Sequence, residues 1–217
     1  MAQVFHPAFN TISRVTIFGG VLVLAAIVWV SGLLYRSSYV TEAAVVRDQP
    51  VPFSHKHHAG QLGIDCRYCH SSVEDSSFAG IPPAKTCMNC HRQIWADSPV
   101  LEPVRRSFSE GTPILWNRVH RLPGYAYFDH SIHVAKGVGC VSCHGQVDEM
   151  PLVAQQATLY MEWCLDCHRH PEASIRPRDR VFEMTWRPAD GEGQAQGARL
   201  AAAYGIQKRT DCVDCHR

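Results

Sequence analysis

Apolar and polar residues divide this chain into two unequal parts. Residues 15–35 (VTIFGGVLVLAAIVWVSGLLY) are 21 consecutive positions without a charge. As a helix they measure about 31 Å at roughly 1.5 Å per residue, enough to cross the hydrocarbon core of a bilayer. We therefore predict a transmembrane helix at 15–35, preceded by a cytoplasmic segment at 1–14.

A cleavable signal peptide is the alternative reading of this segment. The apolar run is longer than the usual signal core of about 7–15 residues, and no small-x-small cleavage site follows it. We therefore interpret the segment as an uncleaved anchor. Charge orients it weakly, because Arg14 lies on one side and Arg36 and Arg47 lie on the other.

The rest of the chain shows little periodicity. Residues 36–52 are expected to form an extended linker, because they end in Pro50-Val51-Pro52. From 53 to 217, glycine and proline interrupt the chain so often that only short helices are expected, near 100–109, near 198–204 and at the cysteine motifs described next. The predicted fold class is mostly irregular with short α-helices and minimal sheet, plus one transmembrane helix.

All ten cysteines lie in five copies of Cys-x-x-Cys-His, the attachment motif of c-type haem. Its two thiols add to the two vinyl groups of one haem, and the adjacent histidine becomes the proximal axial ligand of the iron. We therefore predict five covalently bound haem c groups, which would form much of the apolar core of a domain at 53–217. The attachment residues are Cys66, Cys69, Cys87, Cys90, Cys140, Cys143, Cys164, Cys167, Cys212 and Cys215, and the proximal ligands are His70, His91, His144, His168 and His216.

Paired cysteines also occur in structural zinc sites and in disulfide frameworks. A structural zinc site needs a closed set of four ligands, and a histidine directly after the second cysteine is too close in sequence to complete the same tetrahedron. A disulfide framework does not place a histidine after every second cysteine. Five motifs without exception favour haem.

Haem attachment also predicts a compartment. Covalent haem is attached on the outer side of the cytoplasmic membrane, so the domain after residue 35 is expected on the periplasmic side of a single-pass protein. The formal net charge of +1 excludes a strongly basic nucleic-acid-binding protein.

An internal repeat organises the motifs. Residues 53–91 contain Phe-x-His-x-x-His, then Gly-x-x-Cys-x-x-Cys-His, then a second Cys-x-x-Cys-His. Residues 128–168 repeat this order at an offset of about 75 positions. Such self-similarity indicates two copies of one structural unit. We therefore predict two dihaem modules, at 53–91 and 128–168, and a fifth haem at 212–216.

The repeat also provides distal ligands for the irons. We predict that His55 and His130 bind the haem of the motif that follows each of them. His58 and His133, three residues later, are predicted to reach a neighbouring haem.

The fifth distal ligand has three candidates. His120 stands outside both repeats and is the preferred one, with Met150 and Met161 as alternatives that would raise the potential of that haem. His57 and His170 are expected to be surface residues. The haem propionates, which are ionised, are expected near Arg105, Arg106, Arg118, Arg121 and Lys136, although a solvated basic surface is an equal alternative.

The Phe-x-His-x-x-His motif followed by Cys-x-x-Cys-His resembles the small multihaem cytochromes of class III. The anchor, the five motifs and the segments WNRVHRLP (116–123), YFDHSIHV (127–134), GVGCVSCHG (137–145) and MEWC (161–164) more closely resemble the pentahaem cytochrome c subunits of alternative complex III. This resemblance implies a quinol:electron acceptor oxidoreductase of a respiratory or photosynthetic membrane. Its partners would be an iron–sulfur subunit, quinol-binding membrane subunits, and a monohaem cytochrome or soluble acceptor.

The ligand count independently predicts an electron carrier. If every iron has two axial ligands, no position remains open for a substrate, and the chain is an electron-transfer subunit rather than an enzyme by itself. Two alternatives stay open: a self-sufficient membrane-anchored multihaem quinol dehydrogenase, and a multihaem reductase, which would need a five-coordinate haem.

Overall fold

The computed structural model describes residues 4–216 and divides into two compact units at Ala43 and Ala44. The first unit is dominated by helix α1 (Ala8–Arg36), in which no residue is buried. By length and composition α1 is a candidate membrane span. The helix begins at Ala8, seven residues before the apolar run, so part of the segment expected at 1–14 is helical.

The segment expected to be a linker at 36–52 is not uniform. Its first part contains a short helix, α2 (Ser38–Thr41), which ends at Glu42 in the left-handed conformation. Its last part, from Ala44, belongs to the second unit. There Val51 is buried, and the Gln49 side chain exchanges hydrogen bonds with the backbone of Asn117 at 2.9 Å in both directions. The second unit therefore begins about nine residues before the predicted boundary at 53.

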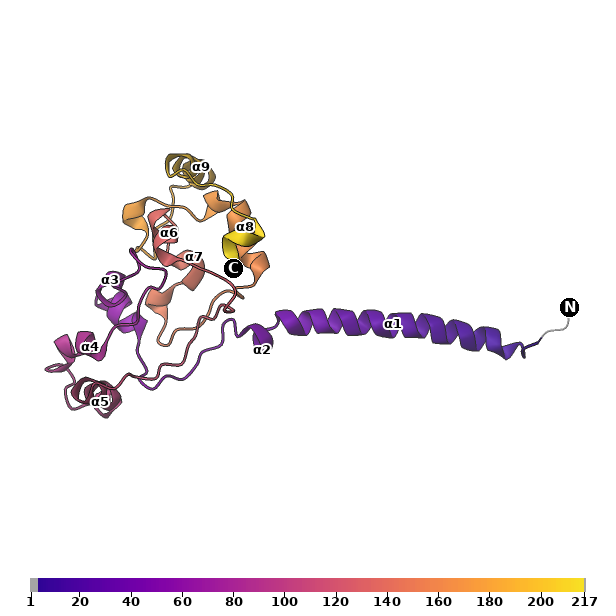
Figure 1. Ribbon diagram of the computed structural model, residues 1–217, viewed down its shortest axis with the longest axis horizontal. Helices are drawn as coiled ribbons and strands as arrows, with labels where there is room; N and C mark the ends of the chain where they lie inside the picture. The colour runs from indigo at the N-terminus through magenta and orange to yellow at the C-terminus, as the bar shows by residue number, and fades with distance from the viewer. Residues whose placement is uncertain (1–3, 217) are drawn as a thin grey trace. The chain divides into compact units, whose positions relative to one another are not determined.

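The second unit is built from short helices separated by turns (Figure 1). They are α3 (Cys66–Cys69), α4 (Ala84–His91), α5 (Glu102–Glu110), α6 (His130–Ala135), α7 (Val141–His144), α8 (Met161–Arg169), α9 (Gly193–Ala203) and α10 (Cys212–Cys215). Single turns lie between them at Lys56–Gln61, Pro99–Leu101, Val147–Glu149, Pro171–Ala173 and Arg178–Arg180. No strand occurs within residues 4–216, where only three isolated bridges pair extended segments. The predicted fold class of short helices with minimal sheet is confirmed.

The protein contributes a small core to this unit. One apolar cluster joins Val51, Met88, Leu101 and Val104, so α4 and α5 pack together around the second cysteine motif. Only eight apolar side chains are buried among the described residues. A unit of this size normally buries far more apolar surface, so the prediction of a haem-packed interior agrees with this thin protein core.

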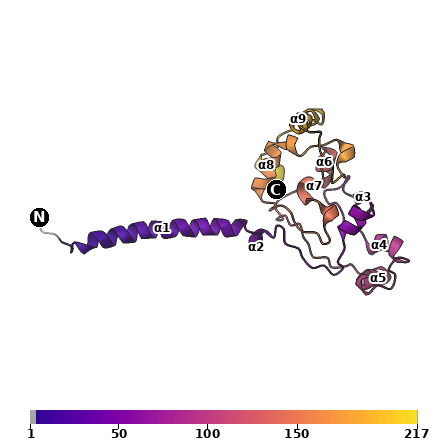
Figure 2. The same cartoon turned by 180° about the vertical axis from the view of Figure 1, so that it is seen from behind.

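The helices that carry the motifs follow one another across the second unit. Both cartoon views show α4 beside α5 at one end, then α3, α7 and α8, with the C-terminal end next to α8 (Figures 1 and 2). The third motif therefore lies in the middle of the unit.

Candidate haem sites

Each motif forms one turn of helix that gathers its reactive side chains. The amide of His70 donates to the carbonyl of Cys66 at 2.8 Å, and His144 and His216 repeat this bond to Cys140 and Cys212 at 2.9 and 2.8 Å. Residues three and four apart share one face of a helix, so both thiols and the imidazole of a motif lie on one side. All ten cysteines are free.

Four proximal histidines face a second imidazole. In each pair the first histidine comes from a His-x-x-His element and the second from a motif. The ring centroids are separated by 6.4 Å in His55–His70, 6.2 Å in His58–His91, 6.3 Å in His130–His144 and 6.2 Å in His133–His168. The structure thus brings together the predicted distal ligands with four of the five proximal ones.

This spacing fits an iron bound on both sides. An imidazole–metal bond of about 2 Å, with about 1 Å more from the nitrogen to the ring centre, separates two axial rings by about 6 Å. Four independent pairs have this same separation. The residues present therefore fit haem with two histidine ligands at the first four motifs.

The two modules have the same local geometry. Phe53 stacks on His58 and meets His55 edge-on, with centroid distances of 4.4 and 4.8 Å. Phe128 makes the corresponding contacts with His133 and His130 at the same two distances. The phenylalanine that begins each repeat thus holds both distal rings, which explains why the repeat includes it.

Backbone carbonyls orient most of the rings. Histidine ligands usually donate the N–H that does not face the metal to a carbonyl or carboxylate, which fixes the tautomer. Seven predicted ligands have their Nδ1 within hydrogen-bond distance of a carbonyl oxygen and so leave Nε2 for iron. The pairs are His58–Ser54, His70–Gly80, His91–Ile94, His130–Ser77, His133–Asp129, His168–Arg209 and His216–Tyr125.

Two of the predicted ligands, His55 and His144, do not have their Nδ1 next to a carbonyl oxygen. Burial lowers the pKa of His144 to about 3 and that of His55 to about 4, and neighbouring histidines add to both shifts. The Nδ1 atom of His55 is buried without a hydrogen-bond partner. Both rings are therefore neutral at pH 7, the state in which imidazole binds a metal.

The structure places His120 beside His144. Nε2 of His120 lies 3.2 Å from Nδ1 of His144, and the two rings are inclined by 70° with centroids 4.5 Å apart. The atom of His120 that would bind iron thus faces a proximal histidine instead. The assignment of His120 as the fifth distal ligand stays a prediction.

The fifth motif has different surroundings. His216 has its Nδ1 3.3 Å from the Tyr125 carbonyl, and the Tyr125 ring lies 5.7 Å from the His216 ring. The two alternative ligands are placed differently: Met161 is 62% exposed, whereas Met150 is half-buried. His57 and His170 are exposed, as expected of surface residues.

Contacts between motifs give their order in space. Burial and the nearby Cys87 raise the pKa of the Cys69 thiol, so the first and second motifs are neighbours. Burial and the nearby Cys66 raise the pKa of the Cys140 thiol to about 11, so the first and third motifs are neighbours too. Ser77, in the loop after the first motif, accepts from the backbone amide of His130 at 3.3 Å. The first module therefore adjoins the second through the first and third motifs.

The third, fourth and fifth motifs are also neighbours in space. Burial raises the pKa of Cys143 to about 12, and the nearby charge of Cys167 adds to the shift. Cys164 in turn interacts with Cys215. The spatial order of the motifs is therefore second, first, third, fourth and fifth, which differs from their order in the sequence.

The basic side chains that were predicted to lie near the haem propionates mostly contact backbone carbonyl oxygens. Arg105 donates to the carbonyls of Ala96 and Ser98, and Lys136 donates to that of Tyr204. Arg106 lies 3.6 Å from the carboxylate of Glu102. Arg118 donates to the carbonyl of His120, and the backbone amide of Arg121 lies 3.4 Å from the Gln155 side chain.

One buried cation was missed by sequence reasoning. Arg176 is only 6% exposed and lies against the third motif. The available signal was the Gly137-Val138-Gly139 segment before Cys140, because glycines there leave room for another part of the chain to approach closely.

A family model described as cytochrome c7 and related cytochrome c matches residues 126–217. These residues include the third, fourth and fifth motifs and the second His-x-x-His element. The matched part of the chain is therefore similar to multihaem cytochromes c.

A curated relative supports the same classification. The multihaem cytochrome c subunit of menaquinone reductase from Nitratidesulfovibrio vulgaris (strain Hildenborough) is 34% identical over 99 residues. The match covers 45% of this chain and 46% of the relative, so the chain spans less than half the length of the relative that it matches.

Proposed function

We propose that this chain is a membrane-anchored pentahaem cytochrome c that carries electrons from a quinol-oxidising membrane complex to a periplasmic acceptor. In this proposal it is an electron-transfer subunit without a substrate site of its own. The complex is of the alternative complex III type, with an iron–sulfur subunit and quinol-binding membrane subunits as partners.

The observation that carries the proposal is the spacing of the paired imidazoles. Four proximal histidines each face a second histidine at a centroid distance of 6.2 to 6.4 Å. Two imidazoles at this spacing fill both axial positions of an iron, so these four haems have no open position for a substrate. Haem c, when bound, supplies a one-electron Fe(III)/Fe(II) couple.

The chain's own residues hold these groups with little freedom. Each motif provides three attachment points on one helical turn, and the ring of each pair that comes from His-x-x-His is packed on Phe53 or Phe128. Carbonyl oxygens fix most Nδ1 atoms. A rigid site suits electron transfer, because fixed dipoles need little reorganisation when the charge changes.

The order of the motifs supports a path with two ends. The second motif lies at one end, beside α5, and the fifth at the other, beside residues 125–127. In the proposal, the electron donor docks near one of these ends and the acceptor docks near the other.

Helix α1 supports the assignment of quinol chemistry to other subunits. Between Val15 and Tyr35 it has no ionisable residue except the tyrosine at its end. Quinol oxidation releases two protons, and intramembrane sites that handle protons are marked by ionisable residues. The relative named as a subunit of menaquinone reductase is consistent with a quinone-linked complex.

Two measurements test the proposal. The intact mass of the purified chain should show five covalent haems, and fewer than four would reject the assignment of the motifs. The detergent-solubilised chain should be reduced by dithionite, but not by a menaquinol analogue until its membrane partners are added. Rapid reduction of the isolated chain by the quinol would instead identify a self-sufficient quinol dehydrogenase. A high-spin signal that responds to nitrite or hydroxylamine would identify a reductase.

A further inference from the structure

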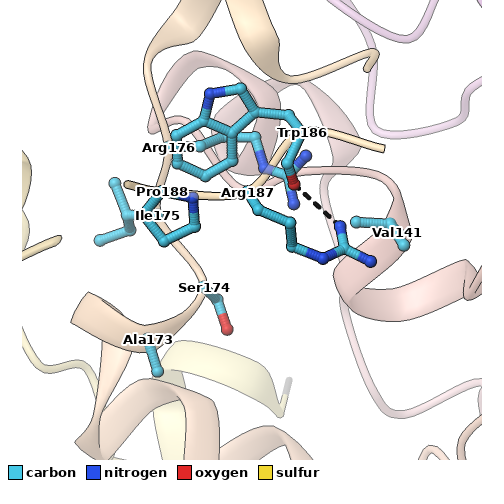
Figure 3. A pocket seen from close by; sticks show the side chains of 8 residues that line it. All are labelled: Val141, Ala173, Ser174, Ile175, Arg176, Trp186, Arg187 and Pro188. Atoms are coloured by element: carbon cyan, nitrogen blue, oxygen red, sulfur yellow. Dashed lines mark hydrogen bonds between the residues drawn. The ribbon is translucent and has the colours of Figure 1, made fainter. Parts of the chain in front are cut away.

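Arg176 is a charged side chain held inside the second unit. Its Nη1 donates to the carbonyl oxygens of Glu183 at 2.8 Å and Arg180 at 3.5 Å. Its guanidinium lies 5.1 Å from the centre of the Trp186 ring. Figure 3 shows Arg176 and Trp186 together on one wall of a pocket of about 280 Å³.

No carboxylate among residues 4–216 forms an ion pair with Arg176. The Glu183 carboxylate accepts from Arg180 at 2.6 Å instead. The Nε atom of Arg176 is buried without an acceptor. Arg187, on the same pocket, adds a second positive charge, and its Nη1 donates to the Trp186 carbonyl at 2.8 Å (Figure 3). The charge of Glu183 favours the Arg176 cation and that of Arg187 opposes it, and the site keeps a net positive charge.

The backbone fixes this charge against the third motif. The amide of Arg176 donates to the carbonyl of Gly137 at 2.9 Å, and Val138 forms a bridge with Ile175. A Cβ atom on Gly139 would overlap the Arg176 guanidinium, so the absence of a side chain there admits the cation. Cys140, the first attachment residue of the motif, follows Gly139 directly in the sequence.

A cation in this position acts differently on the two oxidation states of iron. Reduction removes one positive charge from the haem core, so a fixed positive charge nearby favours the reduced state. Coulomb interactions are strong where solvent does not screen them, and the guanidinium is almost completely buried. Burial and electrostatic environment are among the means by which proteins set haem potentials.

We propose that Arg176 raises the reduction potential of the haem attached through Cys140 and Cys143. That haem lies in the middle of the spatial order of motifs. Arg176 thus makes the central carrier accept an electron from either neighbour more readily than it would without this cation. The inference rests on the proposed five-haem chain.

The test replaces Arg176 in the full chain and measures all five one-electron potentials by a redox titration followed optically. In Arg176→Gln, the reduction potential of one haem should fall. The expected size is a tenfold change in the oxidised-to-reduced ratio of that haem at a fixed applied potential, which corresponds to about 59 mV for one electron. The other four should change much less. Intact mass must first show five haems, which separates a lost haem from an unshifted one.

Two further variants separate charge from structure. Arg176→Lys keeps the charge and should keep the potential near that of the unmodified chain, whereas a purely structural role would make Lys and Gln behave alike. Arg178→Gln removes the same charge two residues away, at an exposed position, and should leave all five potentials unchanged. The proposal is overturned if Arg176→Gln, with five haems present, leaves every potential in place, or if Arg178→Gln shifts the same component equally.

Discussion

The imidazole rings of His55 and His70 lie parallel, with an interplanar angle of 1° and centroids 6.4 Å apart. His130 and His144, the corresponding pair of the second module, are inclined by only 13°. The other pairs differ: His58 and His91 are inclined by 62°, and His133 and His168 by 56°. Each module thus contains one haem site with near-parallel axial rings and one with crossed rings.

These two arrangements should give two kinds of low-spin signal. Parallel imidazole planes separate the energies of the two iron d orbitals that interact with the ring π systems, dxz and dyz. Crossed planes make the energies of these two orbitals nearly equal. We expect the electron paramagnetic resonance spectrum of the oxidised chain to contain rhombic low-spin signals from the first and third haems and highly anisotropic ones from the second and fourth. A single class of signal for all four would contradict the ring geometry.

His58→Ala should affect the second haem alone. It removes the ring that faces His91, so the haem at Cys87 and Cys90 should become high-spin, visible as a change in the Soret and charge-transfer bands. His57→Ala is the matched control, because that ring is exposed, its Nδ1 lies 3.0 Å from the Gln61 side chain, and it meets the His58 ring only edge-on at a centroid distance of 5.4 Å. The control spectrum should be unchanged, and so should that of His170→Ala. If His58→Ala leaves all haems low-spin, the pairing with His91 is not a ligand pair.

Acid should weaken the domain in a defined range of pH. Burial lowers the pKa of His55 from 6.5 to about 4, so the unfolded chain takes up a proton at higher pH than the folded chain does. This contribution to stability is therefore complete above about pH 6.5 and is lost as the pH falls toward 4. Iron at Nε2, where bound, would compete with the proton and extend the loss to lower pH.

The measurement for this prediction is thermal unfolding of the haem-loaded chain between pH 7 and pH 4, followed at the Soret band. The midpoint temperature should fall with pH over this range. A midpoint that rises on acidification would contradict the assignment of His55 as a buried neutral ring.

Much of the candidate site could be predicted because its spacing is local. A Cys-x-x-Cys-His motif closes on itself within one helical turn, and the repeat places His55 and His130 in equivalent positions. The pairing of both with the motif that follows them depends on that short distance in sequence. The structure has the expected partners together in both modules.

The features that were missed depend on distant parts of the chain. His120 lies in an irregular segment outside both modules, so nothing local determines that it meets His144, 24 residues away. Arg176 reaches Gly139 only because the Ile175 segment pairs with Val138. Residues 44–52 look like a linker in composition, but Val51 has a buried place beside Met88. Sequence patterns do not record such long-range contacts.

Gly197→Ala should destabilise the domain although alanine is the better helix former. Gly197 is buried in α9, and a Cβ atom there would overlap the carbonyl oxygen of Glu172. Alanine gains roughly 1 kcal/mol in a helix, but overpacking against a backbone costs about 1–3 kcal/mol. We expect a lower midpoint of thermal unfolding. Gly124→Ala is the control, because nothing lies within 4 Å of its Cβ position. Equal stability of the two variants would show that α9 moves without cost.

His120→Ala tests which haem depends on this histidine. If His120 were the distal ligand of the fifth haem, its removal would create one high-spin haem. In the structure, Nε2 of His120 instead lies 3.2 Å from Nδ1 of His144. A proximal ligand usually donates this N–H to a carbonyl oxygen, and here Nε2 of His120 accepts the hydrogen bond in its place. Removal of such a partner reduces the basicity of the ligand, so it should raise the potential of the third haem while all haems that were low-spin stay low-spin.

The variant and the unmodified chain should therefore be compared by their spin state and their redox titration together. A shift of one component to higher potential with no new high-spin signal agrees with the contact to His144. His120→Gln is the informative second variant, because its side-chain oxygen can accept the same hydrogen bond and should restore part of the original potential. A new high-spin signal in both variants would instead show that His120 is the distal ligand of the fifth haem. If the spectrum and the titration are unchanged in both variants, Met150 and then Met161 are the next candidate ligands to replace.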